Sequence, residues 1–305
     1  MAAWPALPFE DWRATCDTLH AHTQVLGKLC VALAPPEPQL QHSALRLTAR
    51  GWEKRPLAAP DGSGVFAAAL DLHAHEALVE HSDGRSERVP LTPNRPVGDV
   101  TRELLDAVGR VAGEVRIDPT PQEVSWTAPL DEDTEHATYD PAKVAAYLDA
   151  ANRAQLVLAE YRAPYRGRST PVHAWWGSFD LAVSLFSGDP ADPPADDFVM
   201  RNSMDAQEVV VGWWPGYERY ERAAFYSYAH PAPEGFAEGR LTPDPARWEP
   251  GMGLFVLDWD DVVASADPHA TALAFARSSF RHACEVCGWD PALAASAEGK
   301  PPPVT

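Results

Sequence analysis

The feature that most constrains the fold is the alternation of apolar and small polar residues between positions 178 and 185. The apolar set is Phe179, Leu181, Val183 and Leu185, and the polar or small set is Ser178, Asp180, Ala182 and Ser184. A period of two predicts a β-strand with one buried face. Because a solvated face would more often carry Lys, Glu or Thr, we expect the hydroxyl-and-carboxylate face to lie close to a ligand or another backbone.

The same order of elements is predicted twice along the chain. Residues 1–125 show a helix at 9–26 that Gly27 would end, strands at 29–33, 44–49, 65–72, 77–81 and 88–91, and a helix at 99–111. Residues 126–305 show helices at 141–162 and 268–287 around strands at 172–176, 179–186, 208–214, 224–229 and 254–257. We therefore expect an α+β fold of two pseudo-repeated halves, each an antiparallel sheet flanked by helices. Chance remains the alternative, because a helix followed by strands is a common order.

Paired sheets of this kind tend to hold a ligand at or near their joint, and we expect the second half to carry the pocket. The loop at 189–205 carries acidic residues and prolines without periodicity. A solvated excursion is the favoured interpretation of this loop, and a lid over the pocket is the alternative.

Charge and composition restrict the partners. The net charge of −19 argues against nucleic acid and against an anionic membrane surface. No apolar run approaches ~20 residues, and the first residues lack the pattern of a signal peptide. We expect a cytoplasmic protein with a small-molecule ligand, no nucleic-acid partner and no membrane partner. The oligomeric state and any cofactor stay open.

Three side chains are the candidate catalytic groups. His173 and Asp180 belong to the alternating stretch and its approach, and Glu208 opens an apolar strand. A carboxylate among hydroxyls can position a histidine or a substrate amine, and a carboxyl with a raised pKa suits a general acid or base. The alternatives are a buried, hydrogen-bonded Asp180 and a Glu208 at the rim of an aromatic core.

Aromatic and hydroxyl side chains are the candidate ligand-binding residues of the second half. They are Trp175, Trp176, Ser178, Trp214, Tyr226 and Tyr228. Indole and phenol rings combine large apolar area with a polar end, which suits the wall of a slot. Since Trp213 and Trp214 alternate faces, one of the two is expected in the core.

Polar side chains also cluster near the expected end of the first helix, at His20, His22, Gln24 and Lys28. We predict that His22, Gln24 and Lys28 reach a ligand from the helix end. The alternative is that cationic side chains compensate the negative end of the helix dipole.

Two sets of potential metal ligands are weak. Asp71, His73 and His75 would share one face of a strand, but no further ligand is placed near them, so an exposed polar face is favoured. Cys284 and Cys287 form a lone C-x-x-C, which is better explained as small residues closing a helix before Gly288. We therefore predict no metal site.

Several motifs follow one another in a specific order, at residues 4–8, 22–24, 27–28, 34–36, 47–51, 173–188, 212–216, 228–231 and 233–235. With them the chain resembles, over nearly its whole length, the bacterial family catalogued as domain of unknown function 5996. The resemblance implies no activity and no catalytic residues, because the family has none to transfer. His230 stands where members tend to have Tyr, and Gln207 where they tend to have His.

From these observations we expect a small-molecule enzyme that uses acid–base chemistry in an aromatic-lined pocket. One alternative is a non-catalytic binding or sensor protein with the same slot. A second alternative is a metalloenzyme that depends on His73 and His75 or on His22.

Overall fold

The computed structural model describes residues 3–297, which form helices and two sheets. The α-helices are α1 (Phe9–Leu33), α2 (Val97–Ala112), α3 (Pro141–Arg162), α4 (Phe198–Ser203), α5 (Trp259–Ala264), α6 (Pro268–Cys287) and α7 (Pro291–Ser296). Two short 3₁₀ turns are η1 (Pro38–Leu40) and η2 (Phe236–Glu238). None of the helices between residues 3 and 297 combines the length and the apolar character needed to cross a bilayer.

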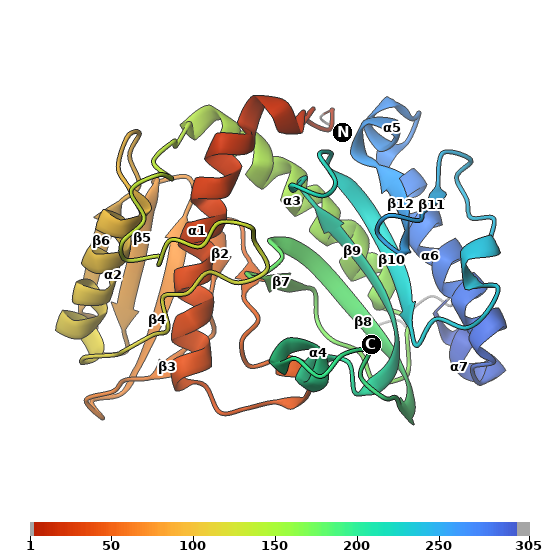
Figure 1. Ribbon diagram of the computed structural model, residues 1–305, viewed down its shortest axis with the longest axis horizontal. Helices are drawn as coiled ribbons and strands as arrows, with labels where there is room; N and C mark the ends of the chain where they lie inside the picture. Colours follow the sequence, from red (N-terminus) through yellow and green to blue (C-terminus); the bar gives the residue numbers. More distant parts are fainter. Residues whose placement is uncertain (1–2, 298–305) are drawn as a thin grey trace, which may run out of the picture.

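The first sheet runs in the order β1-β2-β4-β5-β6, with β3 paired to β4. Its strands are β1 (Arg46–Leu47), β2 (Gly51–Glu53), β3 (Leu57–Ala58), β4 (Val65–Asp71), β5 (Glu76–His81) and β6 (Ser86–Pro90). Every pairing in it is antiparallel. In Figure 1 this sheet occupies the orange, left-hand part of the molecule.

The second sheet runs in the order β11-β12-β10-β9-β8-β7 and is also antiparallel. Its strands are β7 (His173–Trp175), β8 (Asp180–Pro190), β9 (Ala206–Trp214), β10 (Ala224–His230), β11 (Arg247–Glu249) and β12 (Leu254–Asp258). Two antiparallel sheets with flanking helices confirm the predicted α+β fold.

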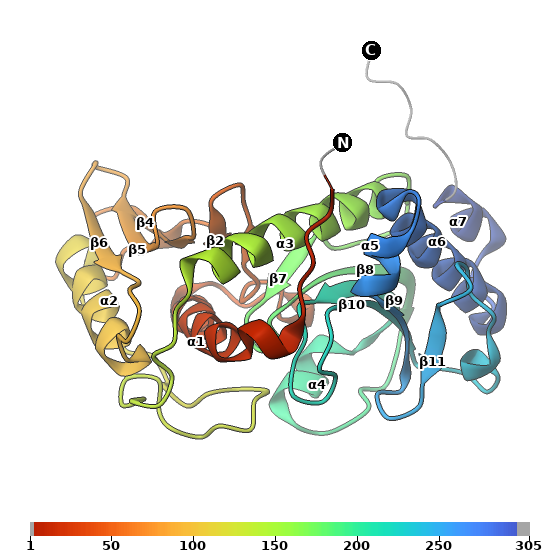
Figure 2. The ribbon, with the colours of Figure 1, turned by 90° about the horizontal axis from the view of Figure 1, so that it is seen from above.

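The two sheets meet at their edges, where Leu45 and Ala174 exchange backbone hydrogen bonds of 2.9 and 3.0 Å. Helix α1 stands at this joint in Figure 1, and α3 runs beside it in the view of Figure 2. Residues that are far apart in the sequence are therefore neighbours at the centre of the molecule.

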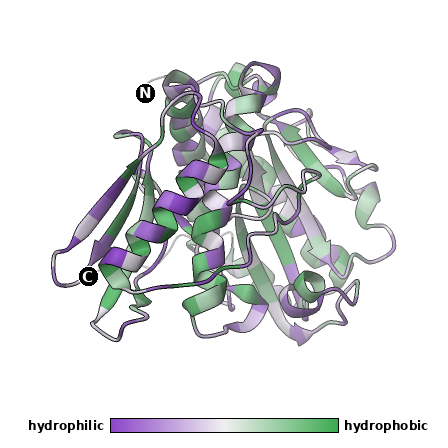
Figure 3. Ribbon diagram, turned by 60° about the vertical axis from the view of Figure 1, so that its left-hand side comes forward, coloured by the Kyte–Doolittle hydropathy of each residue, from purple (hydrophilic) through white to green (hydrophobic). Residues whose placement is uncertain are grey.

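Each sheet buries one face against helices. In the first sheet Phe66, Leu70 and Val79 face the core beneath α1 and α2, and in the second sheet Val183 and Val211 face α3 and α6. The helices supply matching apolar stripes, visible as alternating green and purple bands along them in Figure 3. Burying these stripes is the main driving force for the fold.

The predicted bounds of α3 and α6 agree with the structure at both ends, whereas α4, α5 and α7 were not predicted. Asp140 caps α3 by accepting hydrogen bonds from the N–H groups of Ala142 and Lys143. Gly288 ends α6 in the left-handed conformation, with φ of 65°. The side-chain cap at Asp140 and the left-handed conformation of Gly288 are both typical of helix ends.

The predicted strand at 29–33 is wrong, because α1 continues to Leu33 and Gly27 lies inside it. Gly27 serves a packing role instead: a Cβ atom at this position would lie 2.1 Å from the Trp176 ring. The prediction failed because residues 18–30 are all buried, so the helix has no polar face to create a periodic signal.

Candidate functional site

A cavity of about 230 Å³ lies on the face of the second sheet that α3 and α6 do not cover. Figure 2 shows α3 and α6 on one side of this sheet and α4 on the other. Strand residues in the lining are Trp175, Asp180, Ala182, Ser184, Glu208, Val210, Tyr226 and Tyr228. The remaining lining residues are Val31, Gln39, Leu40, His42, Ser43, Gln122, Glu123, Thr170, Trp176, Gly177, Ser178, Phe198, Val199, Met200, Ser203 and Met204. Residues before position 125 therefore complete a cavity that we had assigned to the second half.

The strand register explains how Asp180 and Tyr226 meet across an intervening strand. Tyr226 on β10 pairs with Gly212 on β9, and Gly212 pairs with Ala182 on β8. A Cβ atom on Gly212 would lie 2.3 Å from the Tyr226 ring, so the missing side chain lets the ring cross β9. The Tyr226 hydroxyl then donates a hydrogen bond to Asp180.

Asp180 is 4 % exposed, and its two carboxyl oxygens each accept a hydrogen bond. The Ser178 hydroxyl donates at 2.5 Å and the Tyr226 hydroxyl donates to the other oxygen. Burial raises the pKa of Asp180 to about 6, although both hydrogen bonds oppose the shift. This carboxyl can therefore gain or lose a proton near neutral pH.

Glu123 is a cavity residue that sequence reasoning missed. Its carboxylate lies over Gly177, where a Cβ atom would meet the Oε2 atom at 2.1 Å. Although the residue as a whole keeps solvent exposure, loss of hydration and the charges of Asp180 and Asp197 raise the pKa of its carboxyl to about 7. Glu123 has no hydrogen bond or ion pair with residues 3–297. Gly177 among bulky neighbours is the one signal in the sequence that a group approaches closely here.

Glu208 lies toward the opposite end of the cavity. It is 4 % exposed and pairs with Phe186 in the ladder, six residues along β8 from Asp180. At 3.3 Å per residue, the two Cα atoms are separated by roughly 20 Å. Burial raises the pKa of Glu208 to about 7, against the effects of a hydrogen bond with Ser184 and of the Arg168 charge.

Trp175 and Trp176 both line the cavity, as predicted for the aromatic slot. The Trp176 indole N–H donates to the Ser43 carbonyl at 3.1 Å, and its ring packs against Gly27 of α1. Lys28 places its ammonium group 5.5 Å from the centre of the same ring. The ring is thus fixed from three sides.

The polar side chains of α1 support the cavity walls, and none of them is part of the lining. Gln24 accepts a hydrogen bond from the Gln122 N–H at 2.9 Å and donates to its carbonyl at 3.0 Å. His20 Nε2 lies 2.9 Å from the Trp176 carbonyl oxygen and 3.0 Å from that of Gly177. Gln24, Lys28 and the buried His22 lie outside the lining, so the structure does not bring these three to the ligand position we expected.

His173 and Trp214 also lie outside the cavity. The His173 ring meets Trp175 edge to face at 5.2 Å, and burial together with nearby arginines lowers its pKa to about 3. It lines a separate pocket of about 70 Å³ with Arg46 and Arg55. The Trp214 ring stacks behind Tyr226 at 4.6 Å. Asp180, Glu208, Ser178, Trp175, Trp176, Tyr226 and Tyr228 are the predicted residues that the structure does bring together.

The loop at 189–205 covers the cavity, against the favoured expectation of a solvated excursion. Its α4 contributes Phe198, Val199 and Met200 to the lining. Phe198 is 58 % exposed and Val31 of α1 is 49 % exposed, so two large apolar side chains of the lining reach solvent. An apolar rim of this kind is typical of a binding site.

A family model described as "Family of unknown function (DUF5996)" matches residues 4–296. The chain belongs to this family. No curated protein and no solved structure gives a significant match to it. The fold and the cavity of this DUF5996 member must therefore be interpreted from their own geometry.

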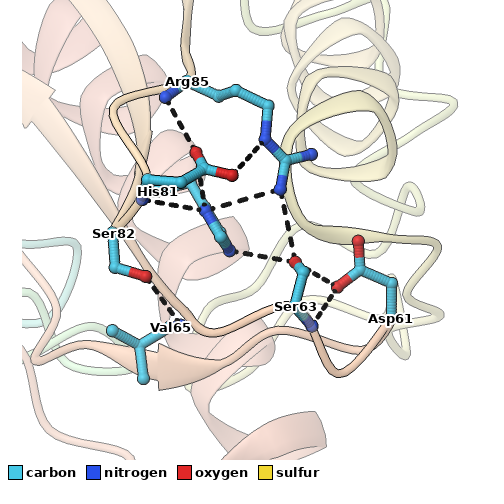
Figure 4. A network of polar contacts seen from close by, with 7 residues as sticks. Asp61, Ser63, Val65, His81, Ser82 and Arg85 are labelled. Atoms are coloured by element: carbon cyan, nitrogen blue, oxygen red, sulfur yellow. Dashed lines mark hydrogen bonds and ion pairs between the residues drawn. The ribbon is translucent and has the colours of Figure 1, made fainter.

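A second polar cluster in this DUF5996 chain has the connectivity of a Ser-His-Asp triad (Figure 4). Ser63 Oγ lies 3.1 Å from His81 Nε2, and His81 Nδ1 lies 2.9 Å from Asp83 Oδ1. The Ser63 hydroxyl, however, is 2.5 Å from Asp61, and the Asp83 N–H donates to His81 Nδ1. The Ser63 hydroxyl donates its hydrogen bond to Asp61, so its proton is not directed at His81 Nε2 and the ring is not placed to act as a base on Ser63. The hydrogen bonds of this cluster connect the loop before β4 to the β5–β6 turn and so stabilise both.

The weak metal candidates do not converge. Residues 72–75 form a turn, so the predicted strand face through Asp71, His73 and His75 is wrong. Asp71 accepts hydrogen bonds from the N–H groups of His73 and Ala74, and the His73 ring contacts the Ala49 carbonyl at 2.9 Å. Within residues 3–297 no group of three or more His, Cys, Asp or Glu side chains could hold a metal ion.

Proposed function

We propose that this protein is a cytoplasmic enzyme that binds a small molecule in the cavity and exchanges protons with it through Asp180 and Glu208. The observation that carries the proposal is that both carboxyls are buried, face one cavity and have raised pKa values, about 6 and about 7. General acid–base catalysis is most effective when the pKa of the catalytic group lies near the operating pH. Perturbed carboxyls in a cleft are also a common mark of functional sites.

The surrounding residues support this use of the cavity. The walls are largely apolar and aromatic, so they exclude water and strengthen electrostatic interactions with a bound molecule. Tyr226 holds Asp180 in place by a hydrogen bond, and Trp175 and Trp176 give the cavity its shape. A few polar groups among aromatic rings are the usual composition of a small-molecule site.

One observation favours a non-catalytic binding or sensor protein as the second candidate. The Cα atoms of Asp180 and Glu208 are separated by roughly 20 Å along the strands, so the two carboxyls do not form a pair around one reacting atom. Two distant carboxyls suit the recognition of two ends of a ligand as well as they suit catalysis.

The test begins with the small molecule that co-purifies with the protein, identified by mass spectrometry and then incubated with it. An enzyme converts the molecule, and Asp180→Asn or Glu208→Gln slows the conversion at least 100-fold while the circular dichroism spectrum is unchanged. Ser63→Ala is the matched control, because it removes a polar group outside the cavity and leaves conversion intact. Full conversion by both carboxyl variants would overturn the proposal, and binding without conversion would establish the second candidate.

A further inference from the structure

We propose that the ligand of this cavity is an aliphatic diamine or polyamine, with one ammonium group bound at the Asp180–Glu123 end and another at Glu208. This inference rests on the proposed use of the cavity as a small-molecule site and assigns the chemical class of that molecule.

The acidic groups lie at two ends of the cavity. The Glu123 carboxylate lies over Gly177, and the next residue, Ser178, donates a hydrogen bond to Asp180, so these two carboxyls form one end. Glu208 forms the other.

Asp180 is hydrogen-bonded to Tyr226, and Glu208 is hydrogen-bonded to Ser184. Both partners lie nearer the middle of the register, so the side chains lean toward each other and roughly 12 Å remain between the two ends. A single ammonium group cannot contact both ends, whereas an extended chain with two amino groups can.

The space between the ends suits a methylene chain. Ala182 and Val210 provide apolar surface, and the rings of Tyr226 and Tyr228 lie nearly parallel with centres 6.4 Å apart. Aromatic faces also attract cations. The Tyr228 hydroxyl makes no hydrogen bond within residues 3–297. Tyr228 pairs with Val210, and Val210 pairs with Ser184, so Tyr228 lies between the two acidic ends and can accept a hydrogen bond from an internal secondary ammonium.

No Lys or Arg side chain of the described part of the chain competes for the carboxyls inside the cavity, because none lies in its lining. Arg168, the cation that acts on Glu208 from a distance, donates to Gln39 at 2.6 Å and packs on the Phe186 ring at 3.6 Å. Glu208 forms no ion pair with a described residue. A buried carboxyl without a counter-charge accepts a cation readily, and the net charge of −19 repels anionic ligands.

The test is isothermal titration calorimetry in 150 mM salt with a matched series of amines. The probes are spermidine, the α,ω-diamines from 1,4-diaminobutane to 1,10-diaminodecane, and octylamine as the monoamine control. We expect an affinity maximum at an intermediate diamine length and at least tenfold weaker binding of octylamine than of 1,8-diaminooctane. Equal affinities for mono- and diamines, or affinity that rises steadily with chain length, would overturn the inference.

Two variants separate the site from general attraction to an acidic protein. Glu208→Gln should reduce the preference for 1,8-diaminooctane over octylamine to less than threefold. Glu132→Gln removes the same charge from an exposed position outside the cavity and should leave the preference unchanged. The chain-length series on the unmodified protein tests the inference even where Glu208→Gln does not fold.

Failure of this inference is distinguishable from failure of the proposed function. Conversion of a co-purified molecule that is not an amine would overturn the inference and support acid–base catalysis in the cavity. Tight, length-dependent diamine binding would support the inference, and binding of the co-purified molecule without its conversion would overturn the enzymatic proposal.

Discussion

The two sheets share one architecture but use their outer faces differently. The first sheet exposes its outer face to solvent and covers it with surface ion pairs such as Arg50–Glu80 and Arg88–Glu76. The second sheet turns its outer face into a cavity that α4 and the loops around Glu123 and Trp176 cover. The difference between the halves therefore lies in the polar face of each sheet, because both pack their other face on helices in the same way.

The polar groups on the two sheets also differ in how they are satisfied. Ser63, His81 and Arg85 form a closed network with Asp61 and Asp83, so each charge has a partner. The carboxyls of the second sheet have raised pKa values, which means that the protein stabilises their charged forms poorly. Polar groups that a fold leaves uncompensated indicate a site for something that the protein binds.

The largest expected effect is a difference in stability between glycine-to-alanine variants of two helices, α1 beside the cavity and α2 on the first sheet. Gly27→Ala should destabilise the protein by about 3 kcal/mol, because its methyl group would overlap the buried Trp176 ring. Gly109→Ala in α2 is the matched control: nothing lies within 4 Å of its Cβ position, so helix propensity should stabilise the protein by up to about 1 kcal/mol. Urea unfolding measures both. The same sign for both variants would contradict the packing of Trp176 on α1.

The next largest effect is the loss of stability expected when the contact between the Tyr226 ring and Gly212, or the hydrogen bond from Tyr226 to Asp180, is changed. Gly212→Ala should cost about 2 kcal/mol by pushing the Tyr226 ring away from β9. Tyr226→Phe keeps the ring and removes only the hydroxyl, so it should cost about 1 kcal/mol and raise the pKa of Asp180 further, since one hydrogen bond that opposes the shift is lost. NMR titration of the Asp180 carboxyl carbon gives the pKa. An unchanged pKa in Tyr226→Phe would show that the hydrogen bond does not form.

The faces on which the strand residues of the cavity lie, and the caps of two helices, were predictable from the sequence because both depend on residues close together in the chain. The alternation from Leu181 to Leu185 placed Asp180 on the face opposite the core, because side-chain direction in a strand follows directly from position. Tyr226 and Tyr228 fell on the same face of β10 for the same reason. The caps of α3 and α6 were recognisable from Asp140 and Gly288.

The remainder depends on contacts between distant segments. Glu123 sits in a proline-containing loop without periodicity, and the backbone of the residue before it, Gln122, is hydrogen-bonded to Gln24 of α1. By its position in the ladder, His173 lies on the same face of the sheet as Asp180. It lines another pocket, formed by β7 and the loop before β1. Periodicity predicts on which face of a sheet a side chain lies, but it does not predict which part of that face other segments cover. The positions of Glu123 and His173 could therefore not be predicted from the sequence.

A smaller effect should appear as a pH dependence of stability that arises in the cavity. The pKa of Glu208 is raised from 4.5 to about 7 on folding, so the folded state binds more protons than the unfolded state between these values. Its contribution to stability is therefore present below pH 4.5 and is lost as the pH rises through 7. Glu208→Gln removes this loss, and its stability relative to the unmodified protein should rise by about 2 kcal/mol between pH 5 and pH 8.

The difference in unfolding free energy between Glu208→Gln and the unmodified protein reports on Glu208 and not on the other titrating groups. The buried His20, His22 and His173 have lowered pKa values and give the opposite slope, but they are present in both proteins and cancel in the difference. The charged or titratable groups around Glu208 are Arg168, Asp205, Tyr228 and the ladder neighbour His230. Unfolding in urea at pH 5 and pH 8 gives the four free energies. A difference that does not change with pH would mean that Glu208 is charged in the folded protein at both values.

The smallest effect is expected in the first sheet, where the polar network resembles a catalytic triad. Ser63→Ala should cost about 1 kcal/mol, because Asp61 and His81 lose a shared hydrogen-bond partner at an exposed position. The variant should convert or bind the cavity ligand as the unmodified protein does, and a fluorophosphonate probe should not label Ser63. Since the Ser63 hydroxyl donates its hydrogen bond to Asp61, His81 is not placed to take the Ser63 proton. Labelling at Ser63 would make the first sheet the reactive one and would reverse the assignment of structural and functional faces.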